Sequence, residues 1–188
     1  RHGVRRQRQM CIRDRLTPAY EQKFGDWIMI RPLTNGYRLP TEAEWAWAIR
    51  YSGTQGAPRF SWGAGMPPKK NSGNFADQSA SDLAPTVIPR FDDGYASTAP
   101  TGKFLPSAIG IYDGSGNVAE WVNDFYTVPT PGQKNPVVDP LGPENGKPHV
   151  IRGSSWRHGG ETELRLTYRD YGTEVRPDVG FRIARSLD

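Results

Sequence analysis

The stretch Gly110–Trp121 reads G-I-Y-D-G-S-G-N-V-A-E-W and places three oxygen-bearing side chains close together, Asp113, Asn117 and Glu120. The glycines between them let the backbone turn sharply. Carboxylate and amide oxygens on such a turn are the ligands that a hard cation such as calcium prefers. Acidic, glycine-rich turns are also common in ordinary loops, so a surface turn leading into a buried Trp is the alternative interpretation.

One helix is expected upstream of this stretch. The segment Tyr37–Trp45 reads Y-R-L-P-T-E-A-E-W, and Thr41 and Glu44 have the spacing of a capping box. The helix is therefore predicted to run from about Glu42 to Tyr51, with Trp45 facing the core.

The long segment 53–106 shows little periodicity and contains a succession of turn signals. An irregular run of this length in a compact domain is normally either disordered or held in place by something. Its aromatic residues argue against disorder. A bound cation would explain how the segment is held.

Short strands are expected at residues 27–30, 121–126, 149–156 with a kink at Gly153, 164–171 and 179–184. The chain of 188 residues also contains 21 Gly and 17 Pro, which favours loops over long regular elements. The pattern predicts an irregular, loop-rich α+β domain. No apolar run is long enough to span a membrane.

Residues 1–15 differ from the rest of the chain. Arg8–Arg15 reads R-Q-M-C-I-R-D-R and looks like a translated adapter from a sequencing library, so residues 1–15 are predicted to be a non-native tail without helical or strand period. They contribute +5 to the net charge of +4, which leaves −1 for residues 16–188 and no basic stripe for nucleic acid. They also contain the only cysteine, Cys11, so the remaining domain has no thiolate for a disulfide or a metal.

Four segments in order resemble one family. They are Tyr37–Trp45, Gly110–Trp121, Val150–Trp156 (V-I-R-G-S-S-W) and Gly180–Arg185 (G-F-R-I-A-R). Together they resemble the formylglycine-generating-enzyme family, also called the sulfatase-modifying-factor domain, over residues 16–188. The resemblance implies a compact, irregular variant of the C-type lectin fold. Because the family pattern usually begins further upstream, we expect an N-terminal part of the domain to be missing.

The resemblance also implies two structural calcium sites. The first would use the side chain of Asn74, the carbonyl of Phe75, the carboxylate of Asp93 and the carbonyl of Tyr95. The second would use the carboxylate of Asp113, the carbonyls of Gly116 and Val118, and the carboxylate of Glu120. The two ions would tie the loop 53–106 to the stretch Gly110–Trp121, so that metal binding contributes to folding.

The oxidising members of the family convert a substrate cysteine to formylglycine and hold copper(I) with two cysteines. Here the corresponding places fall near His158 and Glu163. Because copper(I) prefers soft thiolate ligands, copper is not expected, and no catalytic residue is assigned. A surface histidine is the simpler interpretation of His158, although His158 and Glu163 could join a third group to hold iron or zinc. The adjacent Ser155 is interpreted as a structural hydroxyl, since no base is evident beside it.

A group of arginine and aromatic residues lies where the family's substrate groove would be. Such residues dominate binding hot spots, so the group is a candidate face for a protein, peptide or saccharide ligand. The alternative is that the aromatics belong to the core and the arginines are merely solvated. The members are Trp156, Arg157, His158, Arg165, Tyr168 and Arg169.

Two functional hypotheses follow. The first is a calcium-stabilised, non-oxidising binding domain of a larger bacterial protein, the bacterial source being implied by the resemblance. The alternative is an enzyme of the family that oxidises a sulfatase cysteine to formylglycine, or performs a related metal-dependent oxidation. The compartment stays open, with the bacterial envelope outside the cytoplasm as one candidate.

Overall fold

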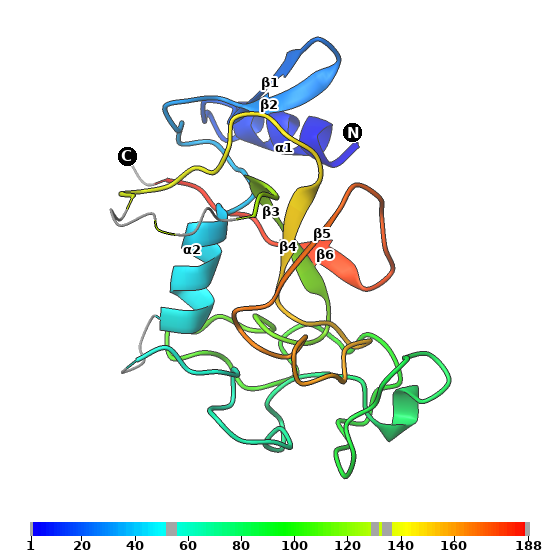
Figure 1. The fold of residues 1–188 in the computed structure, drawn as a ribbon. Coiled ribbons are helices and arrows are strands. Elements are labelled where there is room, and N and C mark those ends of the chain that lie inside the picture. Colours follow the sequence, from blue (N-terminus) through cyan, green and yellow to red (C-terminus); the bar gives the residue numbers. More distant parts are fainter. Residues whose placement is uncertain (1, 52–55, 129–131, 133–136, 187–188) are drawn as a thin grey trace. The chain divides into compact units, whose positions relative to one another are not determined.

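The computed structural model describes residues 2–51, 56–128, 132 and 137–186. The chain divides into two compact units, Arg1–Pro40 together with Arg182–Asp188, and Thr41–Phe181. Figure 1 shows the elements of each unit, which are described separately below.

The first unit contains helix α1 (His2–Arg13) and a hairpin of strands β1 (Tyr20–Lys23) and β2 (Asp26–Met29). The strands are antiparallel, and β2 confirms the strand predicted near residues 27–30, whereas β1 was not predicted. The Sγ atom of the buried Cys11, within α1, accepts a hydrogen bond from the backbone N–H of Tyr37 at 3.2 Å. The prediction that residues 1–15 lack regular structure is therefore wrong, while their non-native origin stays a prediction.

The described residues of the second unit form a four-stranded sheet in the order β5-β4-β3-β6 (Figure 1). The strands are β3 (Ala119–Phe125), β4 (His149–Arg152), β5 (Arg169–Gly172) and β6 (Val179–Phe181). Antiparallel pairing joins β5 to β4 and β4 to β3, whereas β3 and β6 are parallel. The central strand β3 buries alternate residues, and it is the continuation of the stretch with which the sequence analysis began.

Helix α2 (Glu42–Ala46) begins at the predicted residue. Thr41 accepts a hydrogen bond from the N–H of Glu44, and the Glu44 side chain accepts one from the N–H of Thr41, which completes the capping box. A π-helical turn, Trp47–Tyr51, continues α2 to the end of the predicted helix. Trp45 is buried and packs with Val122, Val150 and Leu166 against the sheet.

The loop that follows α2 is held by a second apolar cluster. Its members are Phe60, Trp62, Phe75, Ile88, Phe91 and Leu164. The rings of Phe60 and Trp62 stack with centroids 4.9 Å apart, and Phe75 meets Trp62 edge-on at 5.1 Å. Aromatic packing therefore accounts for part of the order that the sequence analysis attributed to a cation.

The strand predicted at 164–171 is wrong for its first half. The structure has turns up to Tyr168, and only Arg169–Gly172 pairs with β4. The guanidinium of Arg152 donates hydrogen bonds to the carbonyls of Leu166, Thr167 and Tyr168. These carbonyls are therefore not available to pair with a neighbouring strand. Leu164 and Leu166 alternate with less buried residues because they are buried from turns, and not because the segment is a β-strand.

Candidate functional site

The first predicted calcium set converges in the structure. The carboxylate of Asp93 accepts hydrogen bonds from the backbone N–H of Phe75 (2.8 Å) and of Tyr95 (3.0 Å). Asn74 is fully buried, and its amide nitrogen donates to the carbonyl of Ser97 at 2.6 Å. Its Oδ1 atom is buried and has no hydrogen-bond partner within the described part of the chain. A buried acceptor of this kind is costly unless something binds it.

The electrostatics of this set favour a cation. Burial, together with the charges of Asp77 and Asp92, raises the pKa of Asp93 to about 6. Asp77 is itself buried, and one of its oxygens accepts a hydrogen bond from the N–H of Asp93 at 2.7 Å. Two adjacent carboxylates and an unsatisfied amide oxygen thus share a small polar region.

The second predicted set is more dispersed in its hydrogen bonding. Asp113 accepts a hydrogen bond from the N–H of Gly102 at 2.8 Å, whereas the buried Glu120 accepts one from the indole N–H of Trp45 at 2.8 Å. Gly116 has a φ of 87°, and a Cβ there would lie 2.6 Å from the carbonyl oxygen of Asn74. Position 116 therefore requires glycine, because the segments that contain Gly116 and Asn74 approach each other closely. The remaining predicted ligand of this set is the carbonyl of Val118.

Asn117 links the two predicted sets directly. Its backbone N–H donates to the carbonyl of Asn74 at 2.8 Å, and its side chain both accepts from and donates to the backbone of Ala99. From the sequence, Asn117 was a candidate cation ligand, whereas in the structure its amide joins the loop to the stretch Gly110–Trp121. Within the described residues, no group of three or more His, Cys, Asp and Glu side chains could hold a metal, so both predicted sets depend on amide and carbonyl oxygens.

His158 lies in a buried polar network, so its interpretation as a surface histidine is wrong. Its Nδ1 atom accepts a hydrogen bond from the N–H of Ser155 at 3.1 Å. The hydroxyl of Ser155 donates to Asp178, again at 3.1 Å, and not to the imidazole. Ser155 is therefore not paired with a histidine base, in agreement with its interpretation as a structural hydroxyl.

Arg176 and Asp178 complete this network and were not singled out from the sequence. Arg176 donates hydrogen bonds to Asp178 and, at 2.7 Å, to Asp170. Burial would raise the pKa of Asp178, but the hydrogen bond and charge of Arg176 and the hydroxyl of Ser155 lower it overall. The only sequence signal for this carboxylate was the motif D-V-G-F, in which Asp178 directly precedes β6.

The predicted ligand face separates into two groups of contacts. Arg157 lies 5.7 Å from the ring of Trp156, and Tyr168 meets the ring of His158 edge-on at 6.0 Å. Arg169 instead donates two hydrogen bonds to the carboxylate of Glu42. The Nε1 atom of Trp156 and the Nε atom of Arg165 are buried, and neither has a partner among the described residues.

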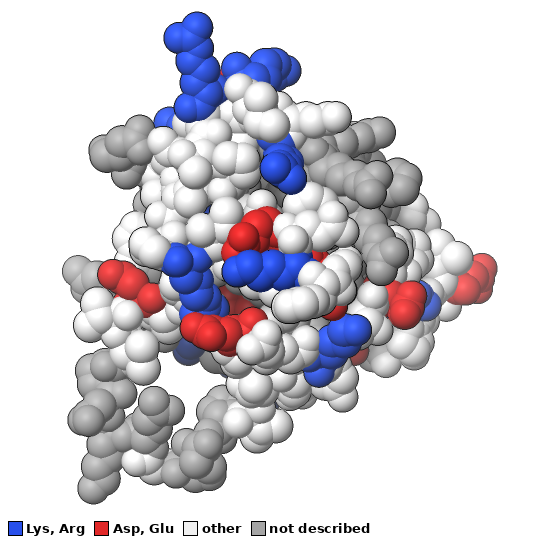
Figure 2. Space-filling view, turned by 90° about the horizontal axis from the view of Figure 1, so that it is seen from above, with Lys and Arg blue, Asp and Glu red and all other residues white. Residues whose placement is uncertain are grey.

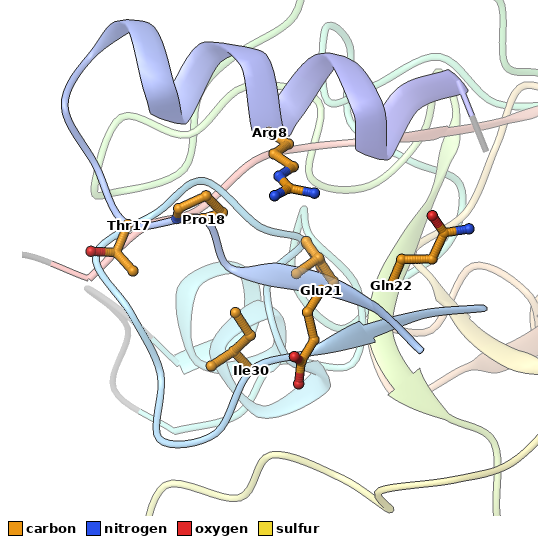
Figure 3. A pocket seen from close by; sticks show the side chains of 7 residues that line it. Arg8, Thr17, Pro18, Glu21, Gln22 and Ile30 are labelled. Carbon is orange, nitrogen blue, oxygen red and sulfur yellow. The ribbon is translucent and has the colours of Figure 1, made fainter. Parts of the chain in front are cut away.

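A pocket of about 400 Å³ lies in the first unit and contains none of the predicted site residues (Figure 3). Its walls come from α1, from β1 with the residues just before it, and from Ile30 just after β2, and Arg8 extends toward the hairpin. On the face shown in Figure 2, Lys and Arg side chains are interspersed with Asp and Glu. None of the described helices combines the length and the apolar character needed to cross a membrane.

Residues 10–187 match the family model described as the sulfatase-modifying factor enzyme 1-like domain. The chain belongs to this family. The predicted loop-rich α+β fold of the formylglycine-generating-enzyme type is thereby confirmed.

The relatives of this family member have different names. A formylglycine-generating enzyme of Streptomyces coelicolor is 38% identical over 157 residues, which are 81% of this chain and 48% of that enzyme. Chaperone protein LppX of Paenibacillus barcinonensis is 29% identical over 161 residues, 85% of this chain and 52% of that protein. The chain thus spans about half the length of these relatives. The solved structure of Treponema denticola variable protein 1 superimposes with a TM-score of 0.76 at 26% identity, over 97% of this chain and 67% of the other.

Proposed function

We propose that the chain is a calcium-stabilised, non-oxidising domain of the formylglycine-generating-enzyme family that binds a protein, peptide or saccharide as part of a larger bacterial protein. The observation that carries the proposal is the chemistry at the two positions where the oxidising members have cysteines. The family resemblance places these positions near His158 and Glu163, and both side chains accept hydrogen bonds from backbone N–H groups, of Ser155 and Gly160 respectively. Neither residue supplies the thiolate that copper(I) prefers, so copper does not fit this set.

Calcium is supported by the first ligand set. Asn74 offers an unsatisfied buried oxygen, and Asp93 offers a carboxylate that is held by the backbone of Phe75 and Tyr95. Oxygen donors of these types, completed by backbone carbonyls, suit calcium. A divalent ion there would offset the cost of burying Asp93 beside Asp77.

A binding role is supported by the aromatic and arginine side chains near His158. Trp156 and Arg157 are adjacent and in contact, and the half-buried Tyr168 packs on His158. Side chains of these types supply much of the affinity at protein interfaces. The variety of names among the relatives, which include a chaperone, agrees with a fold that carries more than one role.

The proposal is tested by a direct assay for oxidation. The protein is incubated with copper(I), oxygen and a cysteine-containing sulfatase-type peptide, and the peptide is examined by mass spectrometry. The Streptomyces coelicolor enzyme serves as the positive control. We expect no formylglycine from this protein; turnover comparable with the control would establish the enzymatic alternative instead.

A further inference from the structure

The imidazole of His158 has a defined orientation that the proposed binding role does not by itself require. We infer that His158 is held as the neutral Nε2–H tautomer and presents that N–H as a hydrogen-bond donor to a neutral carbonyl group of the ligand, such as a peptide amide. The inference rests on the proposed binding function and names the chemistry of one contact within it.

The tautomer follows from the hydrogen bond at the other ring nitrogen. The backbone N–H of Ser155 only donates, so the Nδ1 atom of His158 must accept with its lone pair. A neutral imidazole carries one proton, which must therefore be on Nε2. An additional proton on Nδ1 would place two N–H groups against each other, 3.1 Å apart.

The backbone of His158 is fixed on both sides. Its main-chain N–H donates to the carbonyl of Ser155 at 3.0 Å, and its main-chain carbonyl accepts from the N–H of Ala76 at 3.1 Å. Ser155 is fixed in turn by its hydroxyl bond to Asp178. His158 is only 8% exposed, so little freedom remains for the ring to turn over.

The environment of His158 selects a neutral acceptor. Within the described part of the chain, the hydrogen bond of the imidazole is made at Nδ1, so Nε2 is left for a ligand or water. The charged groups that act on the imidazole are the carboxylates of Glu163, Asp178 and Asp170 and the guanidinium of Arg176. Three negative charges against one positive charge disfavour a carboxylate ligand, whereas an amide carbonyl is unaffected by this imbalance. An Nε2 atom that carries a proton also has no lone pair for a metal.

His149 provides an internal reference for the tautomer. Its Nδ1 atom lies 3.1 Å from the carbonyl oxygen of Asn123, which only accepts. His149 must therefore carry its proton on Nδ1, the opposite arrangement to His158. Long-range proton–nitrogen NMR spectra of protein labelled with ¹⁵N-histidine distinguish the two tautomers, and His158→Asn identifies the His158 signals by their loss.

We expect opposite tautomers for the two residues at pH 7. A proton on Nδ1 of His158, or a charged ring at that pH, would overturn the inference. This outcome is independent of the oxidation assay: the domain can lack oxidase activity while His158 has the other tautomer, and the reverse also holds.

The ligand chemistry is tested with fragments. N-Methylacetamide should shift the His158 Nε2 signal in a saturable manner, and acetate at the same concentration should shift it less. A larger response to acetate, or binding of zinc(II) at one equivalent with loss of the Nε2–H signal, would contradict the inference. The two variants His158→Asn and His158→Gln separate the two nitrogens, since the shorter Asn retains an acceptor for Ser155 and the longer Gln retains a donor near Nε2. Backbone signals of Tyr168 should respond to N-methylacetamide in the Gln variant only; an equal response in the Asn variant would contradict the role of Nε2.

Discussion

Arg169 and Glu42, 127 positions apart in the chain, form a two-pronged ion pair in which Nε donates to Oε1 at 2.7 Å and Nη2 donates to Oε2 at 2.9 Å. Arg152 lies beside them, with its Nε atom 3.6 Å from the same Oε1. One carboxylate at the start of α2 therefore faces arginines from both β4 and β5. The helix is joined to the sheet by charge as well as by the apolar packing of Trp45.

Glu42→Ala should destabilise the second unit strongly. The Arg152 side chain is only 5% exposed, and burial already lowers its pKa to about 10, so loss of Glu42 leaves a buried positive charge without its counter-ion. Removing one partner of a buried pair costs about 3 kcal/mol or more of unfolding free energy, as measured by urea denaturation. Glu161→Ala is the matched control, because its pair with Arg59 is exposed and should contribute less than about 1 kcal/mol. Equal effects of the two substitutions would mean that Glu42 has no special role.

Calcium should raise the melting temperature. At a concentration 100 times the dissociation constant, one bound ion contributes about 2.7 kcal/mol, which corresponds to a shift of about 5 °C or more for a domain of this size. The shift should disappear on addition of a chelator and should shrink in Asp93→Asn and Glu120→Gln. Asp82→Asn, which alters an exposed carboxylate, should leave it unchanged. A melting temperature that does not respond to calcium would remove the metal from the proposal.

Without calcium, Asp93 should make stability fall as the pH rises. Its pKa is raised from 3.8 to about 6 in the folded state, so the folded protein holds this proton more tightly than the unfolded chain does. The resulting contribution to stability is present at about pH 4, is lost as the pH rises to about 6, and does not change further above that. The measurement is the difference in unfolding free energy between the wild type and Asp93→Asn in chelator. Saturating calcium should abolish the dependence of this free-energy difference on pH, since the ion favours the ionised carboxylate. If the difference rises with pH in chelator, then the pKa of Asp93 is not raised in the folded protein.

The double substitution His158→Cys with Glu163→Cys should create affinity for copper(I). Thiolates are the soft ligands that this ion prefers, and the family resemblance places its two cysteines near these positions. The measurement is a competition titration against a copper(I) chelator, with the wild type and each single variant as controls. If the double variant binds no more tightly than either single variant, then the two positions do not converge as the family resemblance implies.

Local signals in the sequence predicted much of the second unit. The capping box at Thr41 located the start of α2, and Gly153, with a φ of 77°, lies directly after β4 where the kink was expected. The strand at 164–168 was wrong because Leu164 and Leu166 alternate for another reason: each is buried in a different apolar cluster. A side chain distant in the sequence, Arg152, then takes the backbone oxygens, and no local pattern indicates that.

The sequence indicated candidate site residues, but it did not indicate which side chains those residues contact. Motif positions placed Asn74, Phe75 and Asp93 in one set, and in the structure Asp93 accepts a hydrogen bond from the N–H of Phe75, the residue after Asn74. The ligand face was predicted from residue type and from proximity in the sequence. That prediction includes Arg169, although its guanidinium forms an ion pair with Glu42. Side-chain partners of this kind depend on tertiary contacts, so residue type alone does not assign them.

The hydrogen bonds from Arg152 to three consecutive carbonyls hold the backbone of residues 166–168 in place, independently of the side chains at those positions. The exposed Thr167 and the partly exposed Tyr168 can change while the main chain under them keeps its course, since the anchoring atoms are common to every amino acid. Such a segment is a natural place for sequence diversification, and randomising its outward positions would yield a library of recognition surfaces on one unchanged frame.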